Sequence, residues 1–306
     1  MTLQVEENEY FQGILKTINN GETVMNSNDI KKIVMDFLRD SGLNEVTNDF
    51  ALRPDLVGMK MFDEPLIGFC RANDACIQGY VNDRNLEDRK SFTQIEPPEF
   101  WLPGAKSIVS IFAPFTEQVR VSNRGGSDPS VEIRHARIEG QQFLNALAKH
   151  LVDTIIAAGY DGVAPSIDAR INMKYEMFDK SVKSGKHYSS SWSERHVAYA
   201  AGLGTFSLSD SFISEKGAAG RATSVITTLE LADEDYAPEA KKGVYENCTK
   251  CGACIRNCPV DAISLESGHD QGICEIFVDE SMQKYRPYYG CAKCQTNVPC
   301  EACVPK

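Results

Sequence analysis

Apolar residues recur at helical spacing in two stretches of the chain, and a third stretch has the boundaries of a helix. The predicted helices cover residues 30–42, about 131–158 and 193–202, and a glycine ends each of them. Asn28 or Asp29 is the expected cap of the first helix, and Ser193 that of the third. The shared faces are formed by Ile30, Ile33, Val34 and Phe37 in the first helix and by Leu144, Leu147, Ala148, Leu151, Val152 and Ile155 in the second.

Short apolar runs with β-branched residues alternate with these helices. They predict buried strands at 65–70, 106–115 and 221–231, and a further strand and turn at 160–166. The polar stretch 166–191 is either an irregular segment near a binding site or a surface loop. Because strands and helices alternate, we expect a layered domain of the α/β or α+β class.

The composition divides the chain into three parts. Residues 1–27 form a polar N-terminal extension, 28–235 the layered domain, and 236–306 a short cysteine-rich domain that we expect to fold around metal. The stretch 232–243 is acidic, contains a proline and marks the boundary between the second and third parts.

Charge and hydropathy limit the function classes. The 306 residues carry a formal net charge of −11, which argues against nucleic acid as the main partner because phosphate binding needs a basic surface. The N-terminus has neither an apolar export segment nor a twin-arginine pair, and no stretch approaches eighteen apolar residues. We therefore expect a cytoplasmic protein without a membrane partner.

The C-terminal cysteines carry the most specific signal. Cys248, Cys251, Cys254 and Cys258 form the motif C-x2-C-x2-C-x3-C, followed by Pro259. This spacing gives three thiolates to one 4Fe–4S cluster and sends the fourth to a second cluster. A zinc ribbon is the alternative, but it would use two separated cysteine pairs.

A second cluster requires further cysteines, and the chain contains them. By two-cluster ferredoxin logic the second cluster takes Cys258, Cys274, Cys291 and Cys294. The first cluster takes one late cysteine, for which we prefer Cys300 to Cys303 because Pro299 stiffens its approach. Two alternatives stay open: Cys274 is an ordinary buried thiol, or Cys303 replaces Cys300.

A glycine-rich turn follows the third predicted helix. Gly202 and Gly204 let the backbone approach a ligand closely, so Gly202, Leu203, Gly204, Thr205, Phe206 and Arg221 are candidate cofactor-binding residues. The competing explanation is that the turn serves packing between a helix and a strand. Spacing alone does not decide between the two.

The order of these parts resembles the epoxyqueuosine reductase family. The resemblance is carried by A-G-L-G at 201–204, the strand at 225–231, the quartet ending in C-P, the single Cys274 and Y-G-C-x2-C-Q at 289–295. It covers about residues 100–300 and extends to the catalytic core of the corrinoid-dependent reductive dehalogenases. The tail departs from the family pattern, because Val298 stands where the last cysteine is expected.

The resemblance implies a fold and a function. It implies a nitroreductase-like α/β domain that binds a cobalamin, followed by a ferredoxin-like domain with two 4Fe–4S clusters. In such a layout an external low-potential donor, of the ferredoxin or flavodoxin type, passes electrons through the clusters to cobalamin, which reduces a small-molecule substrate. A tRNA substrate is not expected, since the chain is acidic and lacks the family's helical-repeat tail.

Reduction of a substrate requires a proton donor. The family's catalytic acid is an Asp before an N-x-L step; counting back from Asn145 lands on Ile138, next to Glu139. Glu139 and His135 lie one helical turn apart and are candidate catalytic residues, unless they belong to a solvated helix start with ion pairs.

Arg195 is the third catalytic candidate, as a holder of an anionic substrate or a cofactor side chain; a surface charge is the alternative. A second hypothesis for the whole protein is an electron-transfer or activator module that reduces a partner, such as a corrinoid protein, without a substrate of its own.

Overall fold

The computed structural model describes residues 25–82, 95–175, 188–238 and 242–306. Its centre is an antiparallel sheet of order β1-β2-β8-β3. The strands are β1 (Leu66–Arg71), β2 (Ser107–Pro114), β8 (Gly220–Thr227) and β3 (Gly162–Val163). All eight residues of β2 are buried, as expected for a central strand covered on both faces.

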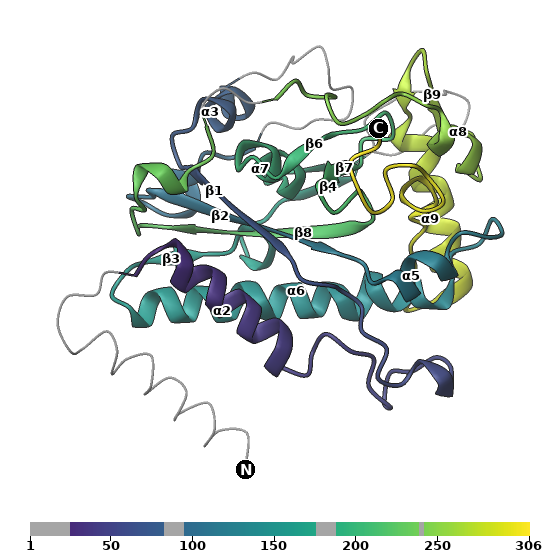
Figure 1. The fold of residues 1–306 in the computed structure, drawn as a ribbon, viewed down its shortest axis with the longest axis horizontal. Helices are drawn as coiled ribbons and strands as arrows, with labels where there is room; N and C mark the ends of the chain where they lie inside the picture. Colours follow the sequence, from purple (N-terminus) through teal and green to yellow (C-terminus); the bar gives the residue numbers. More distant parts are fainter. Residues whose placement is uncertain (1–24, 83–94, 176–187, 239–241) are drawn as a thin grey trace.

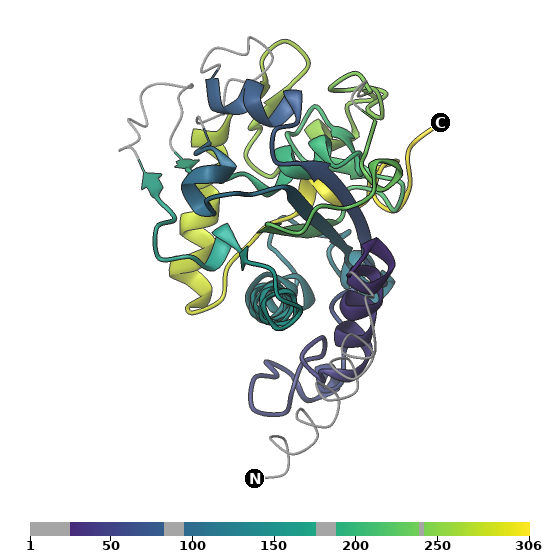
Figure 2. The same ribbon diagram turned by 90° about the vertical axis from the view of Figure 1, so that its left-hand side faces the viewer.

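Two helices cover one face of the sheet, as Figures 1 and 2 show. They are α2 (Ser27–Asp40) and the long α6 (Val131–Ala157), and their apolar faces pack on Val109, Ile111 and Val225. The predicted cap of α2 was wrong by two or three residues. Asn26 is the cap, because its side chain accepts the Asn28 and Asp29 N–H groups while Asp29 accepts the Asn26 N–H.

Smaller helices cover the opposite face. These are α3 (Ala75–Asn82), α4 (Pro98–Trp101) and α7 (Glu194–Ala200), and a further helix, α5 (Glu117–Ser122), follows β2. A second core lies between this layer and the sheet and contains Trp101, Trp192, Ile108 and Phe112. Ser193 precedes α7 as predicted, but its side chain makes no capping hydrogen bond.

Two hairpins follow α6. Within the polar stretch 166–191, β4 (Met173–Tyr175) pairs with β5 (Tyr188–Ser190), and 176–187 lie outside the described residues. After α7 along the chain, β6 (Gly204–Phe206) pairs with β7 (Phe212–Ser214). The predicted strand 221–231 ends earlier, at Thr227.

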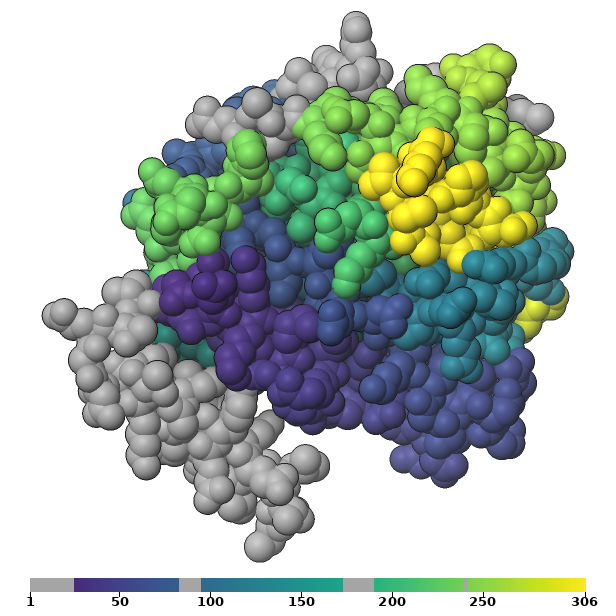
Figure 3. Space-filling view, viewed as in Figure 1, coloured from purple at the N-terminus to yellow at the C-terminus, as the bar shows by residue number. Residues whose placement is uncertain are grey.

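The cysteine-rich part contains little regular structure. It consists of α8 (Ala253–Asn257), a small β9–β10 hairpin (Ile263–Ser264 and Gly268–His269), α9 (Gln271–Tyr285) and loops. The C-terminal segment, residues 296–306, packs between the 242–260 segment and the region of α5 (Figure 3). The paired Arg124 and Glu301 side chains hold it there, with a 2.7 Å hydrogen bond.

The structure confirms a mixed α/β architecture, and its antiparallel sheet makes it α+β. In the described part of the chain, no helix combines the length and apolar character that crossing a bilayer requires. The three predicted domain ranges stay predictions, and 1–24, most of the predicted N-terminal extension, lie outside the described residues.

Candidate functional site

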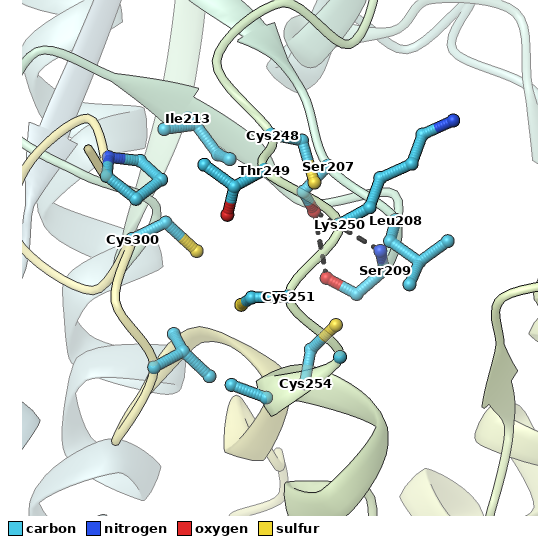
Figure 4. Close-up of a pocket in the computed structure, with 14 residues that line it drawn as sticks. Ser207, Leu208, Ser209, Ile213, Cys248, Thr249, Lys250, Cys251, Cys254 and Cys300 are labelled. Carbon is cyan, nitrogen blue, oxygen red and sulfur yellow. Dashed lines mark hydrogen bonds between the residues drawn. The ribbon is translucent and has the colours of Figure 1, made fainter.

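Four cysteines surround one hollow at the junction of the two parts. Cys248, Cys251 and Cys254 lie on the loop before and within α8, and Cys300 faces them from the C-terminal segment (Figure 4). About 350 Å³ of empty space lies among the lining side chains, counted with the open mouth of the hollow. We call these four residues the first cysteine group.

The β6–β7 hairpin positions one side of the first group. Asn247, next to Cys248, donates its backbone N–H to the Thr205 hydroxyl (2.9 Å) and its side-chain amide to the Ile213 carbonyl (2.9 Å). The Phe206 N–H donates to the Val244 carbonyl at 2.7 Å. The hairpin is thus a platform for the cysteine loop.

The other side of the first group depends on the C-terminal segment. Ala218 donates its N–H to the Cys300 carbonyl (2.7 Å), and Ala219 donates to the Glu301 carbonyl (3.1 Å). Gly217 allows this approach, because a Cβ there would come within 2.4 Å of the backbone at 301 and 302. Cys303 is exposed and does not line the hollow.

The other four predicted ligands lie close to one another beside the first group. Cys274 lies in α9, and the charges of Cys258 and Cys291 act on it. The charges of Cys291, Cys274 and Cys254 act on Cys294 in the same way. We call Cys258, Cys274, Cys291 and Cys294 the second cysteine group. The charge of Cys254 also acts on Cys294, so the two groups lie near each other.

A buried serine cluster adjoins both groups. The hydroxyls of Ser207, Ser209 and Ser211 are hydrogen-bonded to one another at 2.8–2.9 Å. Ser207 and Ser209 line the hollow of the first group, and Ser209 also hydrogen-bonds the Cys294 side chain. Hydroxyls in this place can donate to sulfur, which in iron–sulfur proteins tunes the reduction potential.

One thiol in each group is a poor acid in this environment, as the pKa values of Cys274 and Cys300 show. Burial, followed by the neighbouring Cys291 and Cys258, raises the pKa of Cys274 to about 12. Burial, followed by the neighbouring Cys248, also raises the pKa of Cys300 to about 12. Thiolates at these positions therefore require a compensating positive charge, such as bound iron.

A single metal ion and a 4Fe–4S cluster require different separations of their sulfur ligands. A tetrahedral zinc site brings its thiolates to within about 3.8 Å of each other, given Zn–S bonds of about 2.3 Å. No three Cys, His, Asp or Glu side chains among the described residues are close enough to hold one metal ion. In a 4Fe–4S cluster each thiolate binds a different iron, so four sulfurs surround a larger object.

The residues predicted to bind a cofactor have structural contacts. A Cβ at Gly204 would come within 2.1 Å of the Ile213 carbonyl oxygen, and one at Gly202 would contact Ala237 at 3.0 Å. These two glycines therefore approach the protein's own chain, and cofactor binding by the turn stays a prediction. Leu203 packs against Gly68, and Arg221 donates a hydrogen bond to Gln141 on α6.

The structure places His135 and Glu139 together, but not at a solvated helix start. His135 is fully buried and Glu139 is 7% exposed. His135 Nε2 accepts the Leu52 N–H (3.2 Å), so its Nδ1–H donates to Glu139 Oε2 (3.1 Å). The Tyr288 hydroxyl donates to Glu139 Oε1 at 2.7 Å. Burial, together with Glu139, raises the pKa of Tyr288.

This triad joins α6 to the 50–52 loop and to the cysteine-rich part. Neither His135 nor Glu139 lines the hollow of the first group. Their role as proton donors to a substrate stays a prediction. Arg195, the third catalytic candidate, donates to the Asp210 carbonyl and lies near enough to Cys274 to oppose the rise of its pKa. It thus belongs to the surroundings of the second group.

One acid that nothing in the sequence pointed to, the half-buried Glu194, has a buried carboxylate. Neither of its carboxylate oxygens has a partner of hydrogen-bonding geometry among the described residues, and burial raises its pKa to about 7. The nearby Ser224 hydroxyl, which accepts a bond from Trp192 Nε1 (2.9 Å), opposes this rise. An acidic residue in the first turn of a helix is common, so the sequence carried no signal of its burial.

A family model for 4Fe–4S binding domains matches residues 243–264, which include the whole C-x2-C-x2-C-x3-C motif. No curated protein matches the chain. Among solved structures, the epoxyqueuosine reductase from Bacillus subtilis is similar, with 18% identity over 92% of this chain and 70% of that one, and a TM-score of 0.44.

Two further solved structures are similar. An epoxyqueuosine reductase with a modified tRNA stem loop has 19% identity over 90% of this chain and 66% of that one, with a TM-score of 0.44. A catabolic reductive dehalogenase has 14% identity over 90% of this chain, which spans only 37% of that protein, with a TM-score of 0.48. The chain thus resembles epoxyqueuosine reductases and reductive dehalogenases, and it contains a 4Fe–4S binding domain.

Proposed function

We propose that the protein is an iron–sulfur oxidoreductase that carries two 4Fe–4S clusters and passes electrons from an external donor to an acceptor held by the α+β domain. One observation carries the proposal: eight cysteines of the tail lie as two adjacent groups of four. A 4Fe–4S cluster supplies one-electron transfer at a potential set by its surroundings.

In this proposal the first group holds one cluster and the second group holds the other. Cys294 and Cys254 are near enough for their charges to interact, which supports electron transfer between the two clusters. The serine cluster lies at the junction, and the β6–β7 hairpin and the C-terminal segment hold the two sides of the first group.

The finer proposal, a cobalamin that reduces a small-molecule substrate, rests on the sequence resemblance. Two of the residues predicted to bind it, Gly202 and Gly204, contact the protein's own chain. Because the contacts of these glycines do not form a cradle for a corrin, we assign no step to that cofactor.

Metal and corrinoid analysis of anaerobically purified protein tests both the iron–sulfur proposal and the finer cobalamin proposal. We expect about eight irons per chain, a brown chromophore that bleaches on reduction, and no zinc. The finer proposal requires uptake of added cobalamin, visible as a base-off corrin spectrum. Zinc in place of iron would refute the whole proposal, whereas eight irons without corrinoid uptake would refute only the finer one.

The burial of His135 and Glu139 favours a second candidate, an electron-transfer or activator protein for a redox partner. A proton donor closed in by Leu52 and Tyr288 is poorly placed to reach a substrate. This candidate predicts a stable complex with a corrinoid protein and faster reduction of that partner. A substrate turned over by the isolated protein would argue against it.

A further inference from the structure

A second hollow, with about 600 Å³ of empty space counted with its open mouth, lies beside the second cysteine group. Its walls come from the loop after α5, from α8 and from the segment after Cys291, and its lining includes Cys258 and Pro259. The other lining residues are Asn123, Arg124, Gly126, Ser127, Arg256, Asn257, Lys293 and Thr296. Three of these carry a positive charge, and none carries a negative charge.

The three cations are held in different ways. Lys293 is 4% exposed, and its ammonium donates to the carbonyls of Asn123 (3.0 Å) and Gly125 (2.7 Å). Arg124 is paired with Glu301. Arg256 is exposed and has no ion pair within the described residues. The nearby acid, Asp128, is bonded to Lys284 and Tyr285. The hollow thus keeps an uncompensated positive charge.

This local charge stands out in a chain whose formal net charge is −11. An acidic protein is repelled by most of such a surface, so a basic hollow determines where it can approach. Because Cys258 lines this hollow, a molecule bound there is next to the second cysteine group. Rigid carbonyl contacts hold Lys293, whereas Arg256 is free to meet a carboxylate.

We propose that this hollow is the docking site of a small acidic electron-carrier protein, whose carboxylates meet Arg256 while it reduces the cluster of the second group. The inference rests on the proposed function. The step is a transfer of one electron. The carrier's redox centre loses the electron, the cluster gains it, and no bond forms or breaks.

The test compares two reductants on the iron-loaded full chain. Reduced ferredoxin is the acidic carrier, and photoreduced deazaflavin is a small reductant that needs no docking. Arg256→Glu is expected to lower the ratio of the ferredoxin rate to the deazaflavin rate by about tenfold at low salt, and less at high salt. Arg256→Lys, which keeps the charge, is expected to restore most of the ratio.

Lys149→Glu is the matched control. Lys149 is exposed on α6, about 27 Å along the helix from Val131, and carries the same change of charge. An equal fall in both variants would overturn the inference, since it would reflect net charge alone. An unchanged ratio in Arg256→Glu would also overturn the inference. A third contrary result would be that inorganic phosphate binds in the hollow and leaves the ratio of the two rates unchanged. If deazaflavin reduces no cluster in any variant, the proposed function itself fails.

Discussion

The two parts of the molecule are held together by different forces. Both apolar cores belong to the sheet and its helices, and their buried members end at Tyr236. Within 243–306 the buried apolar residues are Ala253, Ala262, Ile263, Tyr288 and Val298. Apolar burial at about 25 cal/mol per Å² can stabilise the first part but gives little to the second.

The backbone shows the same contrast. Of the described non-glycine residues with a left-handed φ, Lys250, Asp261, Ala292 and Asn297 lie in the cysteine-rich part, and Asp210 is the exception. Such conformations cost of order 1 kcal/mol each and persist where the surroundings impose them. A strained segment without an apolar core indicates that metal binding contributes its folding energy.

Removal of the iron has the largest expected effect on this contrast. Anaerobic chelation should unfold 243–306 and leave the sheet and α6 folded, since the two cores do not depend on the tail. Hydrogen exchange measured by mass spectrometry checks this: amides of α8 and α9 should exchange quickly, and those of β2 should stay protected. Protection of α8 in the iron-free protein would contradict the view that metal folds the tail.

Replacement of single cysteines separates the two groups. Cys254→Ser should reduce bound iron by about half, because it removes a predicted ligand of one cluster. Cys303→Ser is the control: Cys303 is exposed and faces the Pro299 carbonyl, so iron should stay unchanged. Loss of iron in the control would mean that the late ligand is Cys303 instead of Cys300.

The local motifs were the most predictable part of the site. The spacing from Cys248 to Cys258 predicted a cluster, and the matched 4Fe–4S domain contains it. The assignment of four cysteines to each of two clusters stays a prediction. The helices and central strands were also predicted, because hydrophobic spacing reports which face is buried.

Long-range contacts explain what the sequence could not reveal. The alternative of a solvated start for α6 was wrong, because Leu52 and Tyr288, distant in sequence, close over His135 and Glu139. The Gly204 turn suggested a ligand, but the backbone it approaches belongs to β7. Nothing in the local sequence specifies either contact.

The buried carboxylate of Glu194 gives a test of stability that concerns the sheet domain. The pKa of Glu194 is raised to about 7, so protonation stabilises the folded state: the benefit is complete below pH 4.5 and is lost as pH rises towards 7. Glu194→Gln should remove this dependence and gain at most about 3 kcal/mol at pH 8 relative to pH 4.5.

Urea unfolding of the iron-loaded protein and of Glu194→Gln at pH 5, 6.5 and 8 measures this difference. Asp153→Asn is a control, since Asp153 is exposed on α6 and paired with Lys149. A stability difference that does not change with pH would show that Glu194 is ionised throughout, and so solvated or paired.

The smallest expected effect concerns the joint between the two parts. Tyr288→Phe removes the donor to Glu139 Oε1 and leaves a buried carboxylate oxygen without it, at a cost of about 1–3 kcal/mol. Tyr285→Phe is the control, because the Tyr285 hydroxyl bonds the exposed Asp128 and its loss should cost well under 1 kcal/mol. The cost of Tyr288→Phe should appear in the unfolding of the iron-loaded protein and vanish after chelation, since Tyr288 belongs to the part that unfolds without iron.

If the cost persists in the iron-free protein, the 286–290 segment docks on α6 without metal. The limit of the metal-dependent part would then lie after Tyr288, closer to Cys291.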